Sequence, residues 1–89
     1  MAFYKCKALK KISIPAKITY IGTKAFYGCR KLKSITIKTA KLKSSNVGIK
    51  AFGKTPAKAK VKVPKKVYKK YKKLLRKKGV HKKALIRSL

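Results

Sequence analysis

The chain has 89 residues, of which 26 are lysine and 3 are arginine, and it contains no aspartate or glutamate, so its formal net charge is +29. This composition excludes catalysis by paired carboxylates, excludes carboxylate sites for calcium or magnesium, and leaves no acidic side chain for a salt bridge. The length allows one small domain with a thin hydrophobic margin. Repulsion between the charges should make its stability rise with added salt.

The charge also indicates the class of partner. A lysine excess attracts nucleic acid, acidic phospholipid or phosphate-rich cell-wall polymers, but lysine lacks the planar fork with which arginine reads bases. No run of 18 apolar residues and no signal-peptide core is present. Met1 directly precedes an Ala-Phe pair that elsewhere falls inside a repeat, so we expect the chain to begin in mid-repeat, as a fragment would.

One pattern recurs three times along the chain, with a period of 23 and then 26 residues. In each copy an Ala-Phe pair leads, ten residues later, to a short β-branched run: Ala2-Phe3 to Ile12-Ser13-Ile14, Ala25-Phe26 to Ile35-Thr36-Ile37, and Ala51-Phe52 to Val61-Lys62-Val63. The third copy has Thr55 where cysteine is expected and Lys58 where leucine is expected. A period of roughly 20 to 29 residues with one strand per unit predicts stacked coils rather than a conventional globule.

The coils should occupy residues 1–64, with units that begin near residues 2, 25 and 51. Alternate residues of each short strand point inward, so the remaining ones form two ladders on the outer face of a parallel sheet. We predict that this face is an interaction surface made of Lys11, Ser13, Ser34, Thr36, Lys60 and Lys62.

The connectors between units share an apolar-Gly-x-Lys pattern, Ile21-Gly22-Thr23-Lys24 and Val47-Gly48-Ile49-Lys50. We expect each glycine to supply a backbone conformation closed to other residues. The second unit has three additional residues near Ser44-Ser45-Asn46, a turn-forming cluster that should be exposed and mobile.

After Pro64 the apolar period changes to that of a helix that ends at Gly79. Its apolar arc comprises Val67, Tyr68, Tyr71, Leu74 and Leu75, which should cover the open end of the last coil. Residues 65–89 are therefore expected to be a basic amphipathic cap and tail, in which Ala84-Leu85-Ile86 either adds a short strand or frays. Its basic face, a predicted polyanion contact, comprises Lys65, Lys66, Lys69, Lys70, Lys72, Lys73, Arg76 and Lys77.

That basic face has more than one interpretation. It is either a solvated helix surface or a clamp for an anionic polymer, and an undocked helix of this type can also lie on an acidic membrane. Tyr68 and Tyr71 fall on the apolar side, which favours core packing over base stacking.

The unit from Ile21 to Ile37, which reads I-G-x-x-A-F-x-x-C-x-x-L-x-x-I-x-I, resembles the BspA-type leucine-rich repeats of bacterial surface proteins. The resemblance covers residues 2–63, and the helix after Pro64 is similar to the C-terminal ending of some such proteins. It implies an α/β solenoid of leucine-rich repeat coils with a helical cap. It also implies an adhesion module, cell-surface or secreted, whose sheet faces contact host proteins or other cells without catalysis.

The two cysteines occupy equivalent positions, so stacking should bring the backbones of Cys6 and Cys29 close enough for a disulfide. A pair of buried structural thiols is the favoured interpretation and a disulfide is the alternative. A zinc site with His81 would have only three ligands, and a Cys-His nucleophile would need an exposed cysteine. No phosphate-binding, dinucleotide or zinc-protease motif occurs, so we predict no cofactor, no metal and no enzyme activity.

The sequence thus favours a non-enzymatic interaction or adhesion module of a bacterial surface protein, held to anionic cell-wall or host polymers by its basic surface. The alternative is a basic protein that binds nucleic acid without sequence preference through residues 65–83. An all-basic surface engineered onto a natural repeat would give the same composition. The sequence predicts neither a transmembrane segment nor an oligomeric state.

Overall fold

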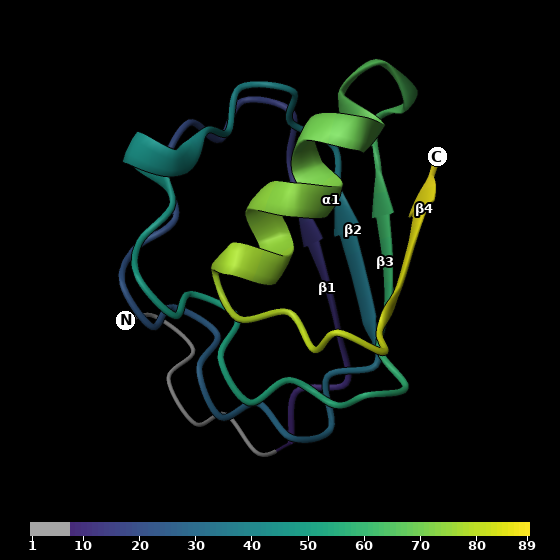
Figure 1. Cartoon of the computed structure of the whole chain (residues 1–89). Coiled ribbons are helices and arrows are strands. Elements are labelled where there is room, and N and C mark those ends of the chain that lie inside the picture. Colours follow the sequence, from purple (N-terminus) through teal and green to yellow (C-terminus); the bar gives the residue numbers. More distant parts are fainter. Residues whose placement is uncertain (1–7) are drawn as a thin grey trace.

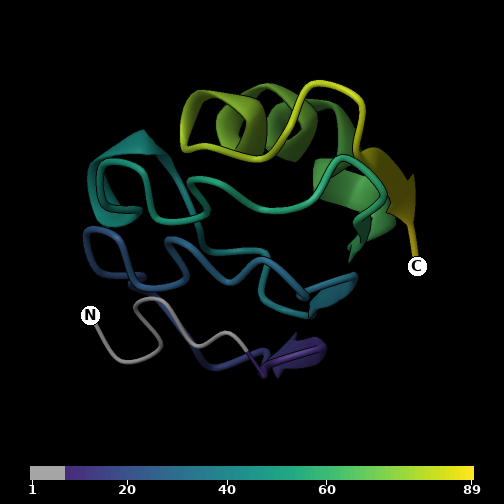
Figure 2. The same ribbon diagram turned by 90° about the horizontal axis from the view of Figure 1, so that it is seen from below.

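The structure is a computed structural model that describes residues 8–89. Four strands form one sheet in chain order: β1 (Lys11–Ile14), β2 (Ser34–Ile37), β3 (Lys60–Val63) and β4 (Leu85–Ser88). The helical segments are the 3-10 helices η1 (Ser44–Asn46) and η2 (Lys65–Val67) and the α-helix α1 (Tyr68–Lys77). Figure 1 shows the strands side by side, and Figure 2 shows the repeat units in layers with α1 over the last of them.

The strands pair in parallel and in register, as the repeats predict. Ile12 is opposite Ile35, Ile35 is opposite Val61, and Val61 is opposite Ile86. β-Branched residues at alternate positions suit a strand with one buried face. The sequence therefore determines both the strands and their register, because a slip of one residue would turn the apolar side chains to solvent.

The core lies between the sheet and the returning chain. The inward side chains of β2 and β3 have no accessible surface, and the rings of Phe26 and Phe52 stack at 5.3 Å between centroids and 12° between planes. In β1, by contrast, Ile12 is only half-buried. This difference is expected because β1 is the first strand of the described sheet, in which β2 is its one neighbour.

The connectors opposite the sheet approach one another closely. Val47 forms a parallel bridge with Ile21, and the amide of Gly48 donates to the Ile21 carbonyl at 2.7 Å. A Cβ on Gly48 would collide with the backbone nitrogen and Cα of Thr23. Gly48 is therefore required for a close backbone approach.

The predicted reason for the connector glycines was wrong. Positive φ angles occur two residues later, at Lys24 (57°) and Lys50 (56°), whereas Gly22 and Gly48 are not among the residues with positive φ. Lysine adopts this left-handed conformation at a cost that glycine would not incur.

The segment near Ser44 is a hydrogen-bonded turn, which the prediction of an exposed, mobile cluster did not anticipate. Ser44 and Ser45 are exposed as expected. The side chain of Asn46, however, accepts from the Lys43 amide at 2.7 Å and donates to the Lys41 carbonyl at 3.0 Å. These two bonds close the loop around η1.

The helix after Pro64 is confirmed, and the chain then rejoins the sheet. α1 ends at Lys77, and Gly79 follows with φ +112°, where a Cβ would come within 2.5 Å of the Gly53 backbone nitrogen. Residues 85–88 form β4 beside β3, which decides between the two predicted outcomes for this segment. The division between residues 1–64 and 65–89 stays a prediction. No helix within residues 8–89 is long and apolar enough to cross a membrane.

Candidate interaction surfaces

The outward face of the sheet carries two columns of side chains, which we call the sheet face. One column runs Lys11, Ser34, Lys60 and Leu85, and the other runs Ser13, Thr36, Lys62 and Arg87. The six residues predicted from the sequence thus align as expected. β4 adds Leu85 and Arg87, which the sequence analysis missed. The signal for them was the 25-residue step from Val61 to Ile86, close to the 26-residue step before it.

The sheet face combines hydroxyl groups with cations. Ser34 and Thr36 on β2 are flanked by Lys11 on one side and by Lys60 and Lys62 on the other. Adjacent strands are about 4.8 Å apart, so these groups repeat at that spacing across the sheet. No carboxylate side chain in the sequence can neutralise them. The face therefore suits a partner that presents anionic groups and hydrogen-bond acceptors.

The basic face of the last unit is divided by the structure into parts with different surroundings. Lys65 and Lys66 are exposed on η2, and the other exposed lysines, Lys69, Lys70, Lys72, Lys73 and Lys77, lie along α1. Arg76 differs from these lysines because its guanidinium donates to the His81 carbonyl at 2.8 Å and to the Ala84 carbonyl at 3.1 Å. Arg76 thus holds the segment before β4, and we leave it out of the anion contact predicted for this face.

In the part of the chain that the structure describes, hollows lie along α1 at two places. The first, which we call the lysine groove, has a volume of about 250 Å³ between η1 and α1 and is lined by Ser44, Lys70, Lys73, Leu74 and Lys77. The second has a volume of about 470 Å³ and is lined by Tyr68, Lys69, Lys70, Lys72 and Lys73. Ser44 is thus the residue of the groove that comes from a different element, and its hydroxyl is the group there that can both donate and accept a hydrogen bond.

Tyr71 joins α1 to the second unit. Its fully buried hydroxyl donates to the Thr39 carbonyl at 2.6 Å and accepts from the Leu42 amide at 3.0 Å. Burial raises the pKa of the Tyr71 phenol, and the hydrogen bond from the Leu42 backbone opposes that rise. Tyr68 is half-buried, with the Lys72 Nζ 5.9 Å from its ring centroid. The prediction that Tyr71 belongs to the core is confirmed, and Tyr68 packs partly against the core.

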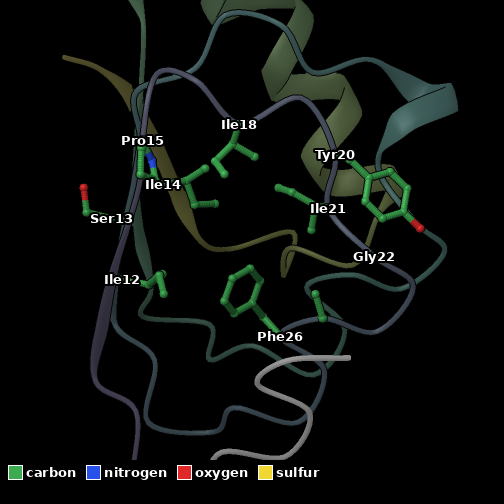
Figure 3. A pocket seen from close by; sticks show the side chains of 10 residues that line it. Ile12, Ser13, Ile14, Pro15, Ile18, Tyr20, Ile21, Gly22 and Phe26 are labelled. Atoms are coloured by element: carbon green, nitrogen blue, oxygen red, sulfur yellow. The ribbon is translucent and has the colours of Figure 1, made fainter.

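An apolar hollow of about 500 Å³ lies beside β1, at the end of the stack away from α1. Figure 3 shows the side chains of Ile14, Ile18 and Phe26 pointing into it, whereas Ser13 points away. Among residues 8–89, those that line the hollow include no lysine, arginine, histidine or cysteine. These described walls can bind apolar groups, and their polar side-chain groups are the hydroxyls of Ser13 and Tyr20.

The side chains that could support other chemistry are those of the two cysteines and the single histidine. Cys29 is fully buried, and Cys6 lies outside the described residues, so the choice between thiols and a disulfide stays a prediction. His81 accepts a hydrogen bond at Nδ1 from the Lys83 amide at 3.0 Å. Within residues 8–89, no group of three or more potential metal-ligating side chains occurs.

A comparison with protein-family models matches residues 1–82 to one described as a BspA type Leucine rich repeat region (6 copies). This match bears out the resemblance noted in the repeats. Leucine-rich repeat domains generally mediate protein binding and are generally non-enzymatic, and proteins with repeats of this type are typically surface proteins. Neither the curated proteins nor the solved structures gave a match to the chain.

Proposed function

Since the chain belongs to the BspA-type leucine-rich repeat family, we propose that it is a non-enzymatic adhesion module of a bacterial cell surface, built as a solenoid of stacked coils. Its partner is an acidic protein on a host surface or on another cell. The sheet face is the part of the module that contacts this partner. The basic face of the last unit provides a second contact, to anionic cell-wall or host polymers.

The observation that carries the proposal is the alignment of the two columns on the sheet face. Ser34 lies between Lys11 and Lys60, and Thr36 lies between Ser13 and Lys62. Hydroxyl groups donate and accept hydrogen bonds, and lysines attract carboxylates, so a partner with exposed acidic side chains complements the face in charge and in hydrogen bonding. The backbone bonds of the sheet fix the spacing of these groups.

The absence of acidic side chains supports a binding role rather than a catalytic one. Without carboxylates the chain has no paired acid and base, and its single histidine already accepts a backbone hydrogen bond. Cys29 is buried in the core, where a nucleophile would not meet substrate.

Binding to nucleic acid remains the second candidate because the net charge of +29 favours it. The tyrosines of α1 argue against a built single-strand site, since Tyr71 is buried and Lys72 lies over Tyr68. Only binding that persists at about 150 mM salt with micromolar affinity would support this candidate, because weaker binding is the ordinary behaviour of a basic protein.

A charge-matched pair of variants tests the sheet face. We expect Lys60→Gln with Lys62→Gln to weaken binding to an immobilised poly-glutamate probe about tenfold at 150 mM salt. Lys66→Gln with Lys69→Gln removes the same charge from the last unit and should weaken it less than about threefold. Surface plasmon resonance with the full chain measures both. Equal losses would show that overall charge, rather than the sheet face, binds the probe.

Labelling of intact cells tests the surface location. Antibody against this chain should bind producing cells before permeabilisation, and external trypsin should remove the signal because the exposed lysines are cleavage sites. A signal that appears only after permeabilisation would contradict the proposed location.

A further inference from the structure

The lysine groove is a better-defined site than the rest of the basic surface because it has two walls. Lys70, Lys73 and Lys77 come from α1, and Ser44 comes from η1. The three lysines are spaced i, i+3 and i+7, which places them on one side of the helix. The groove is therefore lined by three lysines and one serine.

The two walls are fixed relative to each other. Tyr71, on the same helix, is hydrogen-bonded to the backbone of Thr39 and Leu42, which lead into η1. On the other wall, Asn46 closes the η1 loop through bonds to the backbone of Lys41 and Lys43. A ligand would thus find the backbone of both walls already in place and would lose binding energy only to ordering the exposed lysine side chains.

The charges in the groove have no counter-charge from any side chain of the protein. The sequence contains no acidic side chain, and Lys69 and Lys72 on the adjoining hollow add to the positive potential. Like charges on one side of a helix repel one another, so an anion that binds beside them relieves the repulsion as well as making contacts.

The shape and composition of the groove favour a thin phosphate polymer. A volume of about 250 Å³ admits a single chain, whereas a duplex could touch only the rim. Lysine binds phosphate as a point charge, and Leu74 offers an apolar contact to the carbon atoms between phosphates. The described residues that line the groove include no aromatic side chain on which a base could stack, which favours a polymer without bases.

We propose that the lysine groove binds a linear polyol-phosphate chain, with Lys70, Lys73 and Lys77 on the phosphates and the Ser44 hydroxyl hydrogen-bonded to a phosphate oxygen. This inference rests on the proposed attachment to anionic polymers, and it assigns that attachment to one site and one class of ligand. The sheet face takes no part in it.

Charge-matched variants of the full chain test the assignment. The groove variant carries Lys70→Gln, Lys73→Gln and Lys77→Gln, and the control carries Lys31→Gln, Lys33→Gln and Lys38→Gln, three exposed lysines on the segment around β2. The probe is purified poly(glycerol phosphate), and its dissociation constant is measured by isothermal titration calorimetry from 50 to 500 mM salt.

We expect the groove variant to bind at least tenfold more weakly at 150 mM salt and to lose about two to three units of the slope of log affinity against log salt. The control should lose less than one unit. Similar losses in both variants would overturn the proposal, because they would show diffuse attraction. Tighter binding of an oligothymidylate of equal charge would also overturn it, in favour of nucleic acid.

A footprint on the unmodified protein keeps the test independent of variant folding. Saturating poly(glycerol phosphate) should slow acetylation of Lys70, Lys73 and Lys77 at least fivefold more than that of Lys31, Lys33 and Lys38. Uniform protection would contradict the site. The sheet-face variant Lys60→Gln with Lys62→Gln, run in the same assays, separates the two proposals: its loss of poly-glutamate binding concerns the adhesion face only.

Discussion

The segments 25–37 and 51–63 follow the same backbone path one above the other, yet their side chains fill it differently. The amide of Phe26 donates to the Ala51 carbonyl at 2.7 Å, and that of Gly28 donates to the Gly53 carbonyl at 2.9 Å. Four of the positions that differ pair Tyr27 with Gly53, Gly28 with Lys54, Cys29 with Thr55, and Leu32 with Lys58. The backbone bonds, the stacked phenylalanines and the inward strand residues therefore suffice to define a unit.

The third unit replaces several well-adapted residues at a cost in stability. Lys54 holds φ at 58°, a region where Gly28 has 76° without strain. Thr55 buries a hydroxyl oxygen that has no hydrogen-bond partner in the described part of the chain. One replacement instead complements its neighbour, since the ring of Tyr27 packs where a Cβ on Gly53 would be. A unit therefore tolerates poorly adapted side chains when its neighbours keep its backbone in place.

A substitution in the connectors between units should have the largest effect on the free energy of unfolding. Gly48→Ala should lower the free energy of unfolding by about 3 kcal/mol, because the new Cβ would collide with the backbone of Thr23, which cannot move independently. At the equivalent position, Gly22→Ala would meet only the Tyr20 ring among residues 8–89, at 3.7 Å, and should cost less than about 1 kcal/mol. Urea unfolding of both variants measures the difference, and equal costs would contradict the close approach.

Loss of the hydrogen bonds that join α1 to the second unit should have the next largest effect on stability. Tyr71→Phe leaves the Leu42 amide and the Thr39 carbonyl without their buried partner, so we expect a loss of about 2 kcal/mol. The matched control is Tyr68→Phe, because Tyr68 is a half-buried tyrosine on the same helix. This variant should change the free energy of unfolding by less than about 0.5 kcal/mol. Thermal unfolding measures the difference. If both variants had the melting temperature of the unmodified protein, the hydroxyl of Tyr71 would not stabilise the fold.

The two buried threonines should respond with opposite signs. Thr39 Oγ1 donates to the Ile18 carbonyl at 2.6 Å and accepts from the Lys41 amide at 3.1 Å, so Thr39→Val should cost about 1 to 3 kcal/mol. Thr55→Val removes an unpaired hydroxyl and should stabilise the protein by about 1 kcal/mol. Melting temperatures measured side by side decide this, and a loss in both variants would mean that Thr55 is hydrogen-bonded in solution.

Restoring the residue of the second unit should give a smaller gain. Lys54→Gly removes a left-handed lysine and one like charge, and we expect a gain of up to about 1 kcal/mol at low salt. Lys58→Gly removes the same charge from an exposed position without positive φ and should not stabilise to that extent. A gain from Lys58→Gly that matched the first would assign the effect to charge alone.

The smallest effect concerns pH. Because burial raises the pKa of the Tyr71 phenol above its unfolded value of about 10, this phenol keeps its proton in the folded chain at a pH where it would lose it in the unfolded chain. The contribution of this group to stability is therefore complete below about pH 10 and declines as pH rises through the folded pKa. A tyrosinate absorbance titration of the unmodified protein, minus that of Tyr71→Phe, should show one late step. An early step would mean that Tyr71 is exposed to solvent.

The sequence predicted the parts of the fold that repeat. The 23- and 26-residue periods placed β1, β2 and β3 and aligned the six predicted side chains of the sheet face. The change of period after Pro64 placed α1 and the buried side of Tyr71. These features follow from apolar periodicities that can be read along the chain itself.

The sequence did not predict features that depend on contacts between units. The need for glycine at Gly48 arises from the backbone of Thr23, 25 residues earlier, and no local pattern reveals such a contact. Likewise, the sequence places Arg76 among the other cations of a basic helix. In the folded chain its guanidinium instead donates hydrogen bonds to the carbonyls of His81 and Ala84. The lysine groove was missed for the same reason, since Ser44 and α1 come together only in the folded chain.

The double hydrogen bond of Tyr71 also affects how the protein responds to force. It ties the last helix to residues 29 and 32 positions earlier in the chain, while β4 is bonded along its length to β3. A pull on the C-terminus along the strand direction loads the β3–β4 bonds in shear, so they share the load rather than break one after another. Detaching the last unit then also requires breaking the tyrosine link, which makes the C-terminal end harder to peel than its short strand alone would suggest.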